Sequence, residues 1–273
     1  MPLHSGARDL QDDCAVFQFG DETLVVSSDS MAENIHFDSA ADMADVAWKL
    51  VASNLSDLAS CGAQPIGVLL NYTLSSNRAD KRFAEGLNEA LTAHKITLIG
   101  GDTIRNDRII LGMTAIGIAT FLPVPDRRKA KPGDLVYVTG MVGCAMLGFE
   151  GNSSYLGAFN RPKPRIAEGK AIAPFVNAMT DISDGLLLDG FRLASASNVS
   201  IHIDSSSVPV ADPKRKKECL SWGDDYELLF TVPPHFKPPI TCSRIGEITQ
   251  RNSAPLIVDG NAIEISDGLG YEH

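Results

Sequence analysis

The sequence lacks several features that would assign it to a class at once. None of its 273 residues belongs to an apolar run of about 20 residues, the length needed to cross a bilayer. The first ten residues are polar and have no apolar core typical of a signal peptide. The five cysteines are odd in number, scattered and free of any Cys-x-x-Cys pair, which argues against disulfides or structural zinc. We therefore expect reduced thiols, a cytoplasmic location and no membrane partner.

Common nucleotide-binding and nucleophile motifs are also missing. The sequence contains no Gly-x4-Gly-Lys-Ser/Thr phosphate loop, no Gly-x-Gly-x-x-Gly fingerprint and no Gly-x-Ser-x-Gly elbow. Its net charge of −10 argues against nucleic acid as a partner. A phosphate ligand would therefore need a divalent cation to attract it. Magnesium fits this role because it prefers oxygen ligands and bridges to substrate phosphates.

The composition itself is that of a globular protein. Hydrophobic residues make up 44% and charged residues 21% of a chain long enough for two domains. Residues 122–134 contain three prolines and a basic cluster, which is typical of a linker. We expect one domain over residues 1–121 and a second over residues 122–273. The basic cluster is either a solvated loop or the source of an arginine that contacts a nucleotide phosphate.

The first half alternates between strand-like and helical patterns. The predicted strands are 14–19, 23–28, 65–74, 96–99 and 108–120, and the predicted helices are 42–61 and 78–94. The first two strands flank a Gly-Asp-Glu turn and should form a hairpin with Asp13 and Asp29 opposite each other at its open end. Like charges in such a pair favour a bound cation, unless the side chains point into water.

Polar residues interrupt the apolar stripe of the helix predicted over residues 42–61. Asn54 and Asp57 both fall inside this stripe at about 100° per residue. A buried carboxylate is costly without a partner, so Asp57 should meet a metal ion or a firm hydrogen-bond donor. Alternatively, Asp57 lies at the end of the stripe and reaches solvent or caps a neighbouring turn.

A short apolar run at residues 96–99 ends at Gly100-Gly101-Asp102-Thr103. We interpret this segment as a loop whose glycines allow backbone N–H groups to approach a ligand. The resulting hypothesis is that distant acids converge on metal ions that hold a nucleotide's phosphates. These acids are Asp13, Asp29, Asp57 and Asp102.

The second half has further acidic positions. Its predicted strands are 135–139, 199–204, 228–232, 245–248 and 256–258, and its predicted helices are 142–150, 165–176 and 185–197, with an exposed connection over 205–219. Ser183 or Asp184 could simply cap the last helix, whereas Asp181 is harder to explain as a cap. The acids around Tyr226 either line a pocket for a cationic ring or decorate an edge strand.

Several blocks in order along the chain resemble the thiamine-monophosphate kinase family, which belongs to the superfamily of aminoimidazole-ribonucleotide synthetase. The matching blocks are Asp12-Asp13-Cys14-Ala15, Ser27-Ser28-Asp29, His36-Phe37, Asn54-Leu55-Ser56-Asp57-Leu58-Ala59, Gly62-Ala63, Gly100-Gly101-Asp102-Thr103, Lys131-Pro132-Gly133-Asp134, Asp181-Ile182-Ser183-Asp184-Gly185-Leu186, Asp225-Tyr226-Glu227-Leu228 and Gly270-Tyr271-Glu272-His273. Each block alone would be a weak signal, but their order over nearly the whole chain is highly specific.

The resemblance implies a fold and an activity. The fold would be a two-domain aminoimidazole-ribonucleotide synthetase-like α/β (α+β) fold, with mixed sheets flanked by helices. Its first domain would bind metal and ATP and form a homodimer, and its second would complete the active-site cleft. The activity would be ATP-dependent phosphorylation of thiamine monophosphate to thiamine diphosphate. The substrate's own phosphate would attack, so no side-chain nucleophile is implied.

The resemblance also assigns residues. Several magnesium ions would be held by Asp13, Ser27, Ser28, Asp29, Asp57, Asp102, Asp181 and Asp184, of which Asp29, Asp57, Asp102 and Asp184 are the most critical. The nucleotide would contact Gly101, Asp102, Arg127 and Ser183. Thiamine monophosphate would contact His36 and Asp224.

The chain departs from the family pattern at three places. The helix that usually precedes the Asp-Asp block is missing or shortened. Relatives often have Gly-Gly-Glu/Asp-Asp-Tyr where this chain has Trp222-Gly223-Asp224-Asp225-Tyr226, and a substrate-stacking aromatic near the C-terminus is replaced, with Gly268 at that place in a gapless match. Alternative functions are another ATP-dependent synthetase or maturation enzyme of the superfamily, or a nucleotide-binding relative without catalysis.

Overall fold

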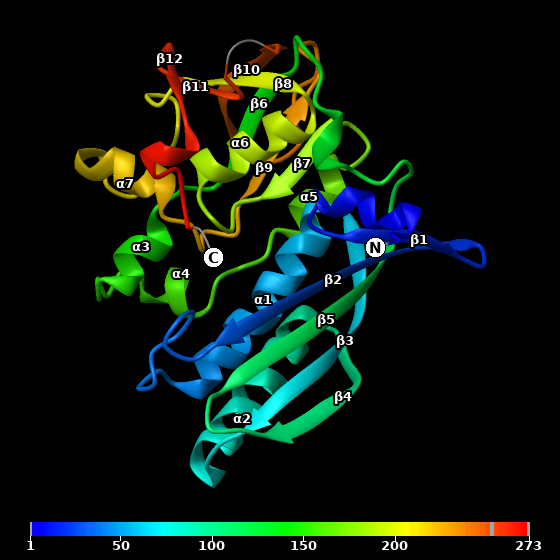
Figure 1. Cartoon of the computed structure of the whole chain (residues 1–273), viewed down its shortest axis with the longest axis vertical. Helices are drawn as coiled ribbons and strands as arrows, with labels where there is room; N and C mark the ends of the chain where they lie inside the picture. Colours follow the sequence, from blue (N-terminus) through cyan, green and yellow to red (C-terminus); the bar gives the residue numbers. More distant parts are fainter. Residues whose placement is uncertain (1, 252–253, 272–273) are drawn as a thin grey trace.

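The computed structural model describes residues 2–251 and 254–271. Its first half is a five-stranded sheet in the order β1-β2-β5-β3-β4, with β3 and β4 parallel and the other pairs antiparallel. The strands are β1 (Ala15–Phe19), β2 (Glu22–Ala32), β3 (Ala63–Leu74), β4 (Thr97–Arg105) and β5 (Ile110–Ala119). A short helix, η1 (Ser5–Leu10), precedes them (Figure 1).

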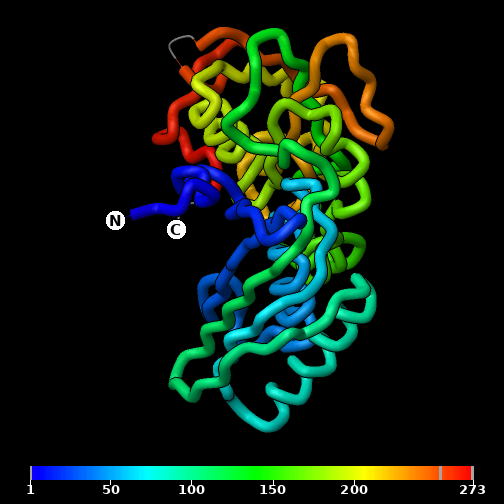
Figure 2. The backbone as a smooth tube through the Cα atoms, turned by 90° about the vertical axis from the view of Figure 1, so that its right-hand side faces the viewer, coloured from blue at the N-terminus to red at the C-terminus, as the bar shows by residue number. Residues whose placement is uncertain are grey.

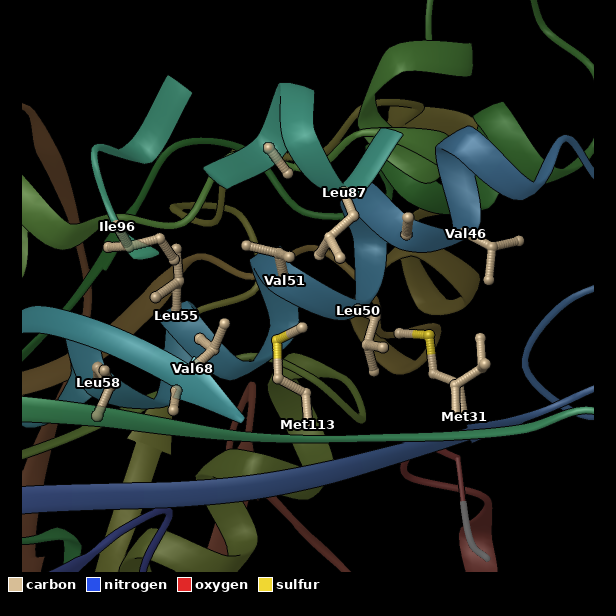
Figure 3. Close-up of a cluster of buried hydrophobic side chains, with 14 of the residues drawn as sticks. Met31, Val46, Leu50, Val51, Leu55, Leu58, Val68, Leu87, Ile96 and Met113 are labelled. Atoms are coloured by element: carbon tan, nitrogen blue, oxygen red, sulfur yellow. The ribbon is translucent and has the colours of Figure 1, made fainter. Parts of the chain in front are cut away.

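Two long helices, α1 (Met43–Ser60) and α2 (Asn77–His94), pack on one face of this sheet. Each begins at a side-chain cap, because Asp42 accepts from the N–H of Ala44 and Ser76 accepts from that of Ala79. Figure 3 shows the core between helices and sheet, with leucines of α1 facing side chains from the strands and from α2. Neither α1 nor α2 covers the opposite face of the sheet (Figure 2).

The second half is a seven-stranded mixed sheet in the order β12-β11-β8-β10-β6-β9-β7. Its strands are β6 (Leu135–Thr139), β7 (Ala178–Asp181), β8 (Val199–Ile203), β9 (Leu228–Val232), β10 (Cys242–Gln250), β11 (Leu256–Val258) and β12 (Asn261–Ile263). Its helices are η2 (Arg127–Lys129), α3 (Cys144–Phe149), α4 (Leu156–Asn160), α5 (Ile166–Ile172), α6 (Leu186–Ala196), η3 (Pro213–Arg215), α7 (Lys216–Ser221) and η4 (Ile265–Asp267).

The end of α1 joins the two halves. Ala59 packs in a buried cluster with Ile172 of α5 and Met179 of β7, so one helix contributes to both cores. Gly169 of α5 lies so close to α1 that an added Cβ would meet the carbonyl oxygen of Ala59 at 2.1 Å. This close contact places the C-terminal turns of α1 beside β7, an edge strand of the second sheet (Figure 1).

The mixed sheets flanked by helices confirm the expected fold class, but some elements differ from the predictions. The segment predicted as a loop over residues 100–103 is part of β4, where Gly101 adopts φ +151° and pairs with Leu70. The segment over 205–219 contains η3 and part of α7, so it is not only an exposed connection. The strand β7 and the helix α4 were not predicted.

The hairpin is present, but its register differs from the prediction by one residue. Ala15 pairs with Val26 and Phe19 with Glu22, which is out of step with a facing pair of Asp13 and Asp29. The prediction that these two acids oppose each other is therefore wrong. The turn is tighter than the Gly-Asp-Glu segment suggested, because Glu22 already belongs to β2.

Candidate functional site

A cleft of about 770 Å³ lies between the two halves of the chain. Its lining includes most of the residues singled out from the sequence, namely Asp13, Asp29, His36, Asp57, Arg127, Asp181, Ser183, Asp184 and Asp224. These residues come from the segment before β1, from β2, α1, η2 and β7, and from the loops after β2, β7 and α7, so segments far apart in the sequence meet here (Figure 1). Of the four acids expected to converge from distant parts of the chain, Asp13, Asp29 and Asp57 line this cleft.

Three carboxylates form the centre of the cleft. One oxygen from each of Asp13, Asp57 and Asp181 lies within 4.8 Å of the other two. Asp57 and Asp181 are buried, at 8% and 2% exposure, as the position of Asp57 in the apolar stripe predicted. Because these acids come from the segment just before β1, from α1 and from β7, the cluster requires both halves of the fold.

A serine hydroxyl orients each of the three carboxylates. Ser27 donates to Asp57, and its own side chain is buried. Two further serines come from α1 itself: Ser56 donates to Asp181 at 2.6 Å and Ser60 donates to Asp13 at 2.8 Å. Helix α1 therefore orients two carboxylates besides its own Asp57, through Ser56 one residue before it and Ser60 three residues after it.

The electrostatics of the cluster favour a cation. Burial, together with the charges of Asp29 and Asp181, raises the pKa of Asp57 well above its usual range. Burial and the charge of Asp13 likewise raise the pKa of Asp181, while the hydroxyl of Ser56 opposes this shift. Adjacent buried carboxylates repel one another unless protons or a positive ion neutralise them. Three clustered oxygen ligands of this kind match the preference of hard divalent ions such as Mg²⁺.

Arg127 supplies a positive charge at the edge of the cluster. Its guanidinium donates to Asp13 and, at 2.8 Å, to the hydroxyl of Thr180. The Nε atom of the same side chain is buried without a hydrogen-bond partner. An unpaired buried donor is unusual and needs an explanation. One arginine of the basic segment therefore enters the cleft, whereas its neighbour Arg128 pairs with Asp126 and Asp9.

The loop that carries Ser183 and Asp184 is held by Asp189, a residue that sequence reasoning missed. The buried carboxylate of Asp189 accepts the backbone N–H groups of Ser183 at 3.1 Å and of Asp184 at 3.0 Å. Arg192 contacts both Asp184 and Asp189. Helix α6 has Gly185 at its N-cap with no side-chain cap, so neither Ser183 nor Asp184 serves as the capping residue.

The residues of β2 divide between the two faces of the sheet. Ser27 and Asp29 lie on the face that packs against α1, and the N–H of Asp29 donates to the side chain of Asn54. Ser28 points to the other face, where its hydroxyl lies 3.0 Å from that of Thr114. The Ser28 side chain is therefore not brought into the cluster. His36 lines the cleft and accepts from the N–H of Ala32.

Asp102 and Gly101 do not line the cleft. Both are exposed on the edge strand β4, where Asp102 lies in one row with Asn71 on β3, Gly112 on β5 and Ser30 on β2. Three strand spacings separate Asp102 from Ser30, or about 14 Å. Gly101 is required for close pairing, because an added Cβ would lie 1.8 Å from the carbonyl oxygen of Leu70. Within this chain the expected convergence of Asp102 with the other acids is thus wrong.

Asp224 alone of the acids around Tyr226 faces the cleft. Asp225 accepts from the N–H groups of Gly143 and Ala145, and Glu227 pairs with Arg165. Strand β9 lies between β6 and β7, so these acids do not decorate an edge strand. The carboxylate of Asp224 accepts from the ammonium of Lys49 at 2.6 Å and from the Tyr226 hydroxyl at 3.0 Å.

Lys49 is a second residue that sequence reasoning missed. Its side chain is 7% exposed, yet it lines the cleft together with Ser53 and Asp57. The spacing of four residues between these three places them on successive turns of one face of α1. This spacing was visible in the sequence, because a lysine inside an apolar stripe is as unusual as an aspartate there.

Comparisons with known proteins agree with this architecture. The family model described as the AIR synthase related protein, N-terminal domain, matches residues 11–119, and the corresponding C-terminal domain matches residues 131–259. The chain is 35% identical to the thiamine-monophosphate kinase of Escherichia coli (strain K12) over 300 aligned positions, which cover 96% of this chain and 90% of the relative.

Solved structures with a similar fold fall into two groups. One is described as AaThiL complexed with AMPPCP and TMP; it matches with a TM-score of 0.86 and 28% identity, covering 93% of this chain and 89% of the other. Another is the hydrogenase maturation protein HypE in complex with ATP, with a TM-score of 0.71 and 17% identity over 95% of this chain and 88% of the other. The second likeness shows the fold alone.

Proposed function

The chain belongs to the thiamine-monophosphate kinase family, and we propose that its acidic cleft is the site where ATP phosphorylates thiamine monophosphate to thiamine diphosphate. The observation that carries this assignment is the cluster of Asp13, Asp57 and Asp181, whose oxygens lie within 4.8 Å of one another. The similar structure described with AMPPCP and TMP supports ATP and thiamine monophosphate as the two substrates.

Magnesium is the cation that we propose for this cluster. Asp13, Asp57 and Asp181 would hold it, with Asp29 and Asp184 as further carboxylates on the walls of the cleft. When bound, Mg²⁺ would neutralise phosphate charge and link the phosphates of the nucleotide to the protein. The raised pKa of Asp57 and Asp181 supports this proposal, because mutually repelling carboxylates gain most from a divalent ion.

The chain's own residues would then position the two phosphates. Arg127 has a buried Nε without a partner and a guanidinium shared between Asp13 and Thr180, so it is placed to contact a nucleotide phosphate. Ser183 would contact the nucleotide from the loop held by Asp189. The acceptor is itself a phosphate anion near neutral pH, so positioning and charge neutralisation are sufficient and no general base is required.

We further propose that the active form is a homodimer that uses the uncovered face and edge of the first sheet. Large apolar side chains are exposed there at Ile66, Leu98, Ile99, Ile104 and Ile110. Strand β4 forms the sheet edge, and such an edge offers unpaired backbone groups to another chain. A second copy on this surface is the arrangement that would allow Gly101 and Asp102 to contribute to a nucleotide site.

A cytoplasmic location is also proposed. All five cysteines are free, as expected for thiols in a reducing compartment. Among the described residues, no helix combines the length and the apolar character needed to cross a membrane.

The direct test compares acceptors under identical conditions. The protein is incubated with ATP, Mg²⁺ and either thiamine monophosphate, thiamine or an aminoimidazole ribonucleotide precursor, and both ADP and thiamine diphosphate are measured. We expect ADP and thiamine diphosphate in equal amounts from thiamine monophosphate only. ATP binding without turnover of any acceptor would contradict the proposal and favour a relative without catalysis, whereas turnover of the precursor would favour a synthetase.

A further inference from the structure

Three aromatic side chains border one end of the cleft. Phe149 ends α3, Phe159 lies in α4 and Trp222 follows α7, and all three line the cavity. The ring of Phe149 lies 5.3 Å from that of Phe159 and 5.2 Å from that of Trp222, measured between centroids. We call this set the aromatic trio.

The trio is supported on one side and open on the other. Trp222 packs against the buried cluster of Met146, Leu147 and Cys219, which fixes its position. Phe149 remains 58% exposed, although it is a large apolar residue at the wall of a cavity. Aromatic side chains in this setting are typical of a subsite for a flat ring, because they offer a large contact area of defined orientation.

A positive charge already occupies the face of one of these rings. The ammonium nitrogen of Lys49 lies 3.9 Å from the ring centroid of Phe159 and 2.6 Å from the carboxylate of Asp224. An aromatic face together with a carboxylate is a binding site for a cation. The Tyr226 hydroxyl also donates to Asp224, whose backbone adopts φ +58°, so this carboxylate is held in an uncommon conformation.

The distances along α1 match the shape of the substrate. Lys49 and Asp57 are eight residues apart on one face of the helix, or about 12 Å along its axis. The acceptor assigned under the proposed function carries a cationic thiazolium ring, which a short arm connects to its phosphate. A ring at the trio would place that phosphate between Lys49 and the acidic cluster, as transfer from a metal-bound nucleotide requires.

We propose that the aromatic trio and Asp224 bind the cationic thiazolium ring, and that the Lys49 ammonium holds this place only until the substrate enters. The ring then replaces the ammonium over Phe159, and Lys49 turns to the substrate's phosphate. This inference rests on the proposed function. It also offers a reason for Trp222 in this chain, where the resembled family has glycine and where a C-terminal aromatic is replaced.

The first test uses substitutions of Phe149, which is exposed enough to change without loss of the fold. We expect Phe149→Ala and Phe149→Leu to raise the KM for thiamine monophosphate about 5- to 30-fold, while Phe149→Tyr retains the wild-type value. The KM for ATP and the kcat should change less than threefold in all of them. The matched control is Phe19→Ala, an exposed phenylalanine at the hairpin tip, outside the cleft.

The second test separates the charge of the ring from its shape. Binding of thiamine monophosphate and of its neutral thiophene isostere is measured by calorimetry with wild-type protein and with the Lys49→Met variant. We expect the wild type to bind the neutral isostere at least tenfold more weakly. The variant should bind thiamine, which has no phosphate, more tightly than wild type, and thiamine monophosphate more weakly.

Different failures have different meanings. Suppose that wild-type protein forms thiamine diphosphate but binds thiamine monophosphate and its neutral isostere equally, and that Phe149→Leu keeps the wild-type KM for thiamine monophosphate. The ring subsite is then wrong, while the proposed function stands. If Lys49→Met weakens thiamine and thiamine monophosphate equally, Lys49 is a fixed part of the ring site and the exchange is wrong. If wild-type protein turns over no thiamine monophosphate, the proposed function itself fails.

Discussion

Replacing Asp57 by asparagine should separate metal binding from folding. The asparagine keeps an oxygen that can accept from Ser27, but it removes the charge at the centre of the cluster. Without metal, the variant should be at least as stable as wild type, because it lacks a buried carboxyl group whose pKa is raised by burial and by the charges of Asp29 and Asp181. With metal, it should lose the stabilisation that binding provides.

The expected size follows from linkage between binding and unfolding. At a Mg²⁺ concentration 100 times its Kd, binding stabilises wild type by about 2.7 kcal/mol. For a chain of this size the Tm then rises by roughly 5 to 10 °C. Residues that only orient metal ligands contribute about 10- to 100-fold in affinity, so loss of a direct ligand charge should weaken affinity about 100-fold or more. At the same concentration the variant then gains about 0.4 kcal/mol, or roughly 1 °C.

The assay is thermal unfolding over a Mg²⁺ titration, with turnover measured on the same samples. Asp80→Asn is the matched control, because Asp80 lies on α2, accepts from the hydroxyl of Tyr72 on β3 and does not line the cleft. The control can differ from wild type in absolute Tm but should keep the full Mg²⁺-dependent rise. A rise of equal size in wild type and in Asp57→Asn would refute the assignment of Asp57 to the metal site, as would wild-type turnover in the variant.

Three further predictions concern pH, assembly and the edge strand. Burial raises the pKa of Asp189 to about 7, above its value in the unfolded chain, so the stability that this shift contributes is full below pH 3.8 and is lost as the pH rises through about 7. In EDTA, the free energy of unfolding of wild type should therefore fall more steeply between pH 5 and 8 than that of Asp189→Asn. Equal slopes of this free energy against pH, measured by urea titrations, would contradict the prediction. Ile104→Asp, at a side chain 52% exposed on β4, should shift the protein from dimer to monomer in sedimentation, and an unchanged mass would rule out this face as the interface. Gly101→Ala should lower the free energy of unfolding by at least 1 kcal/mol, because its Cβ would lie 1.8 Å from the oxygen of Leu70; an unchanged urea midpoint would show that β4 accommodates the methyl group.

Much of the site could be predicted because single residues break local rules. Asp57 interrupts an apolar helical stripe, and Asp181 precedes a helix without being placed to cap it, so the sequence alone marks both residues as candidates for chemistry. The alternation of short strands and helices indicated an α/β chain, and the family resemblance implied mixed sheets flanked by helices, which the structure confirms.

The remainder depends on contacts that local patterns do not encode. Glycines before Asp102 suggested a ligand loop, but Gly101 serves the close pairing of β4 with β3, which depends on the register between distant strands. The register of the hairpin differs by one residue from the prediction, which assumed a turn centred on Asp21. In the structure Phe19 pairs with Glu22, so the turn contains only Gly20 and Asp21. The tail residues Glu272 and His273 lie outside the described residues.

Positioning residues were also missed for a physical reason. Asp189 lies inside α6 and looks like an ordinary helical acid, yet it accepts two backbone N–H groups from the loop that precedes the helix. Such a role depends on how the loop folds back on the helix. Lys49, in contrast, had a signal in its spacing of eight residues from Asp57, and that signal identifies α1 as an element that lines the cleft.

The most direct measurement is anomalous diffraction from Mn²⁺, used in place of Mg²⁺, in crystals grown with AMPPCP. We expect at least one strong peak within coordination distance of Asp13, Asp57 and Asp181, with the phosphates of the nucleotide on its open side and Arg127 in contact with them. Crystals of turnover-competent protein in which AMPPCP is bound, while manganese lies only outside this cluster, would contradict the convergence of these acids on a shared metal ion.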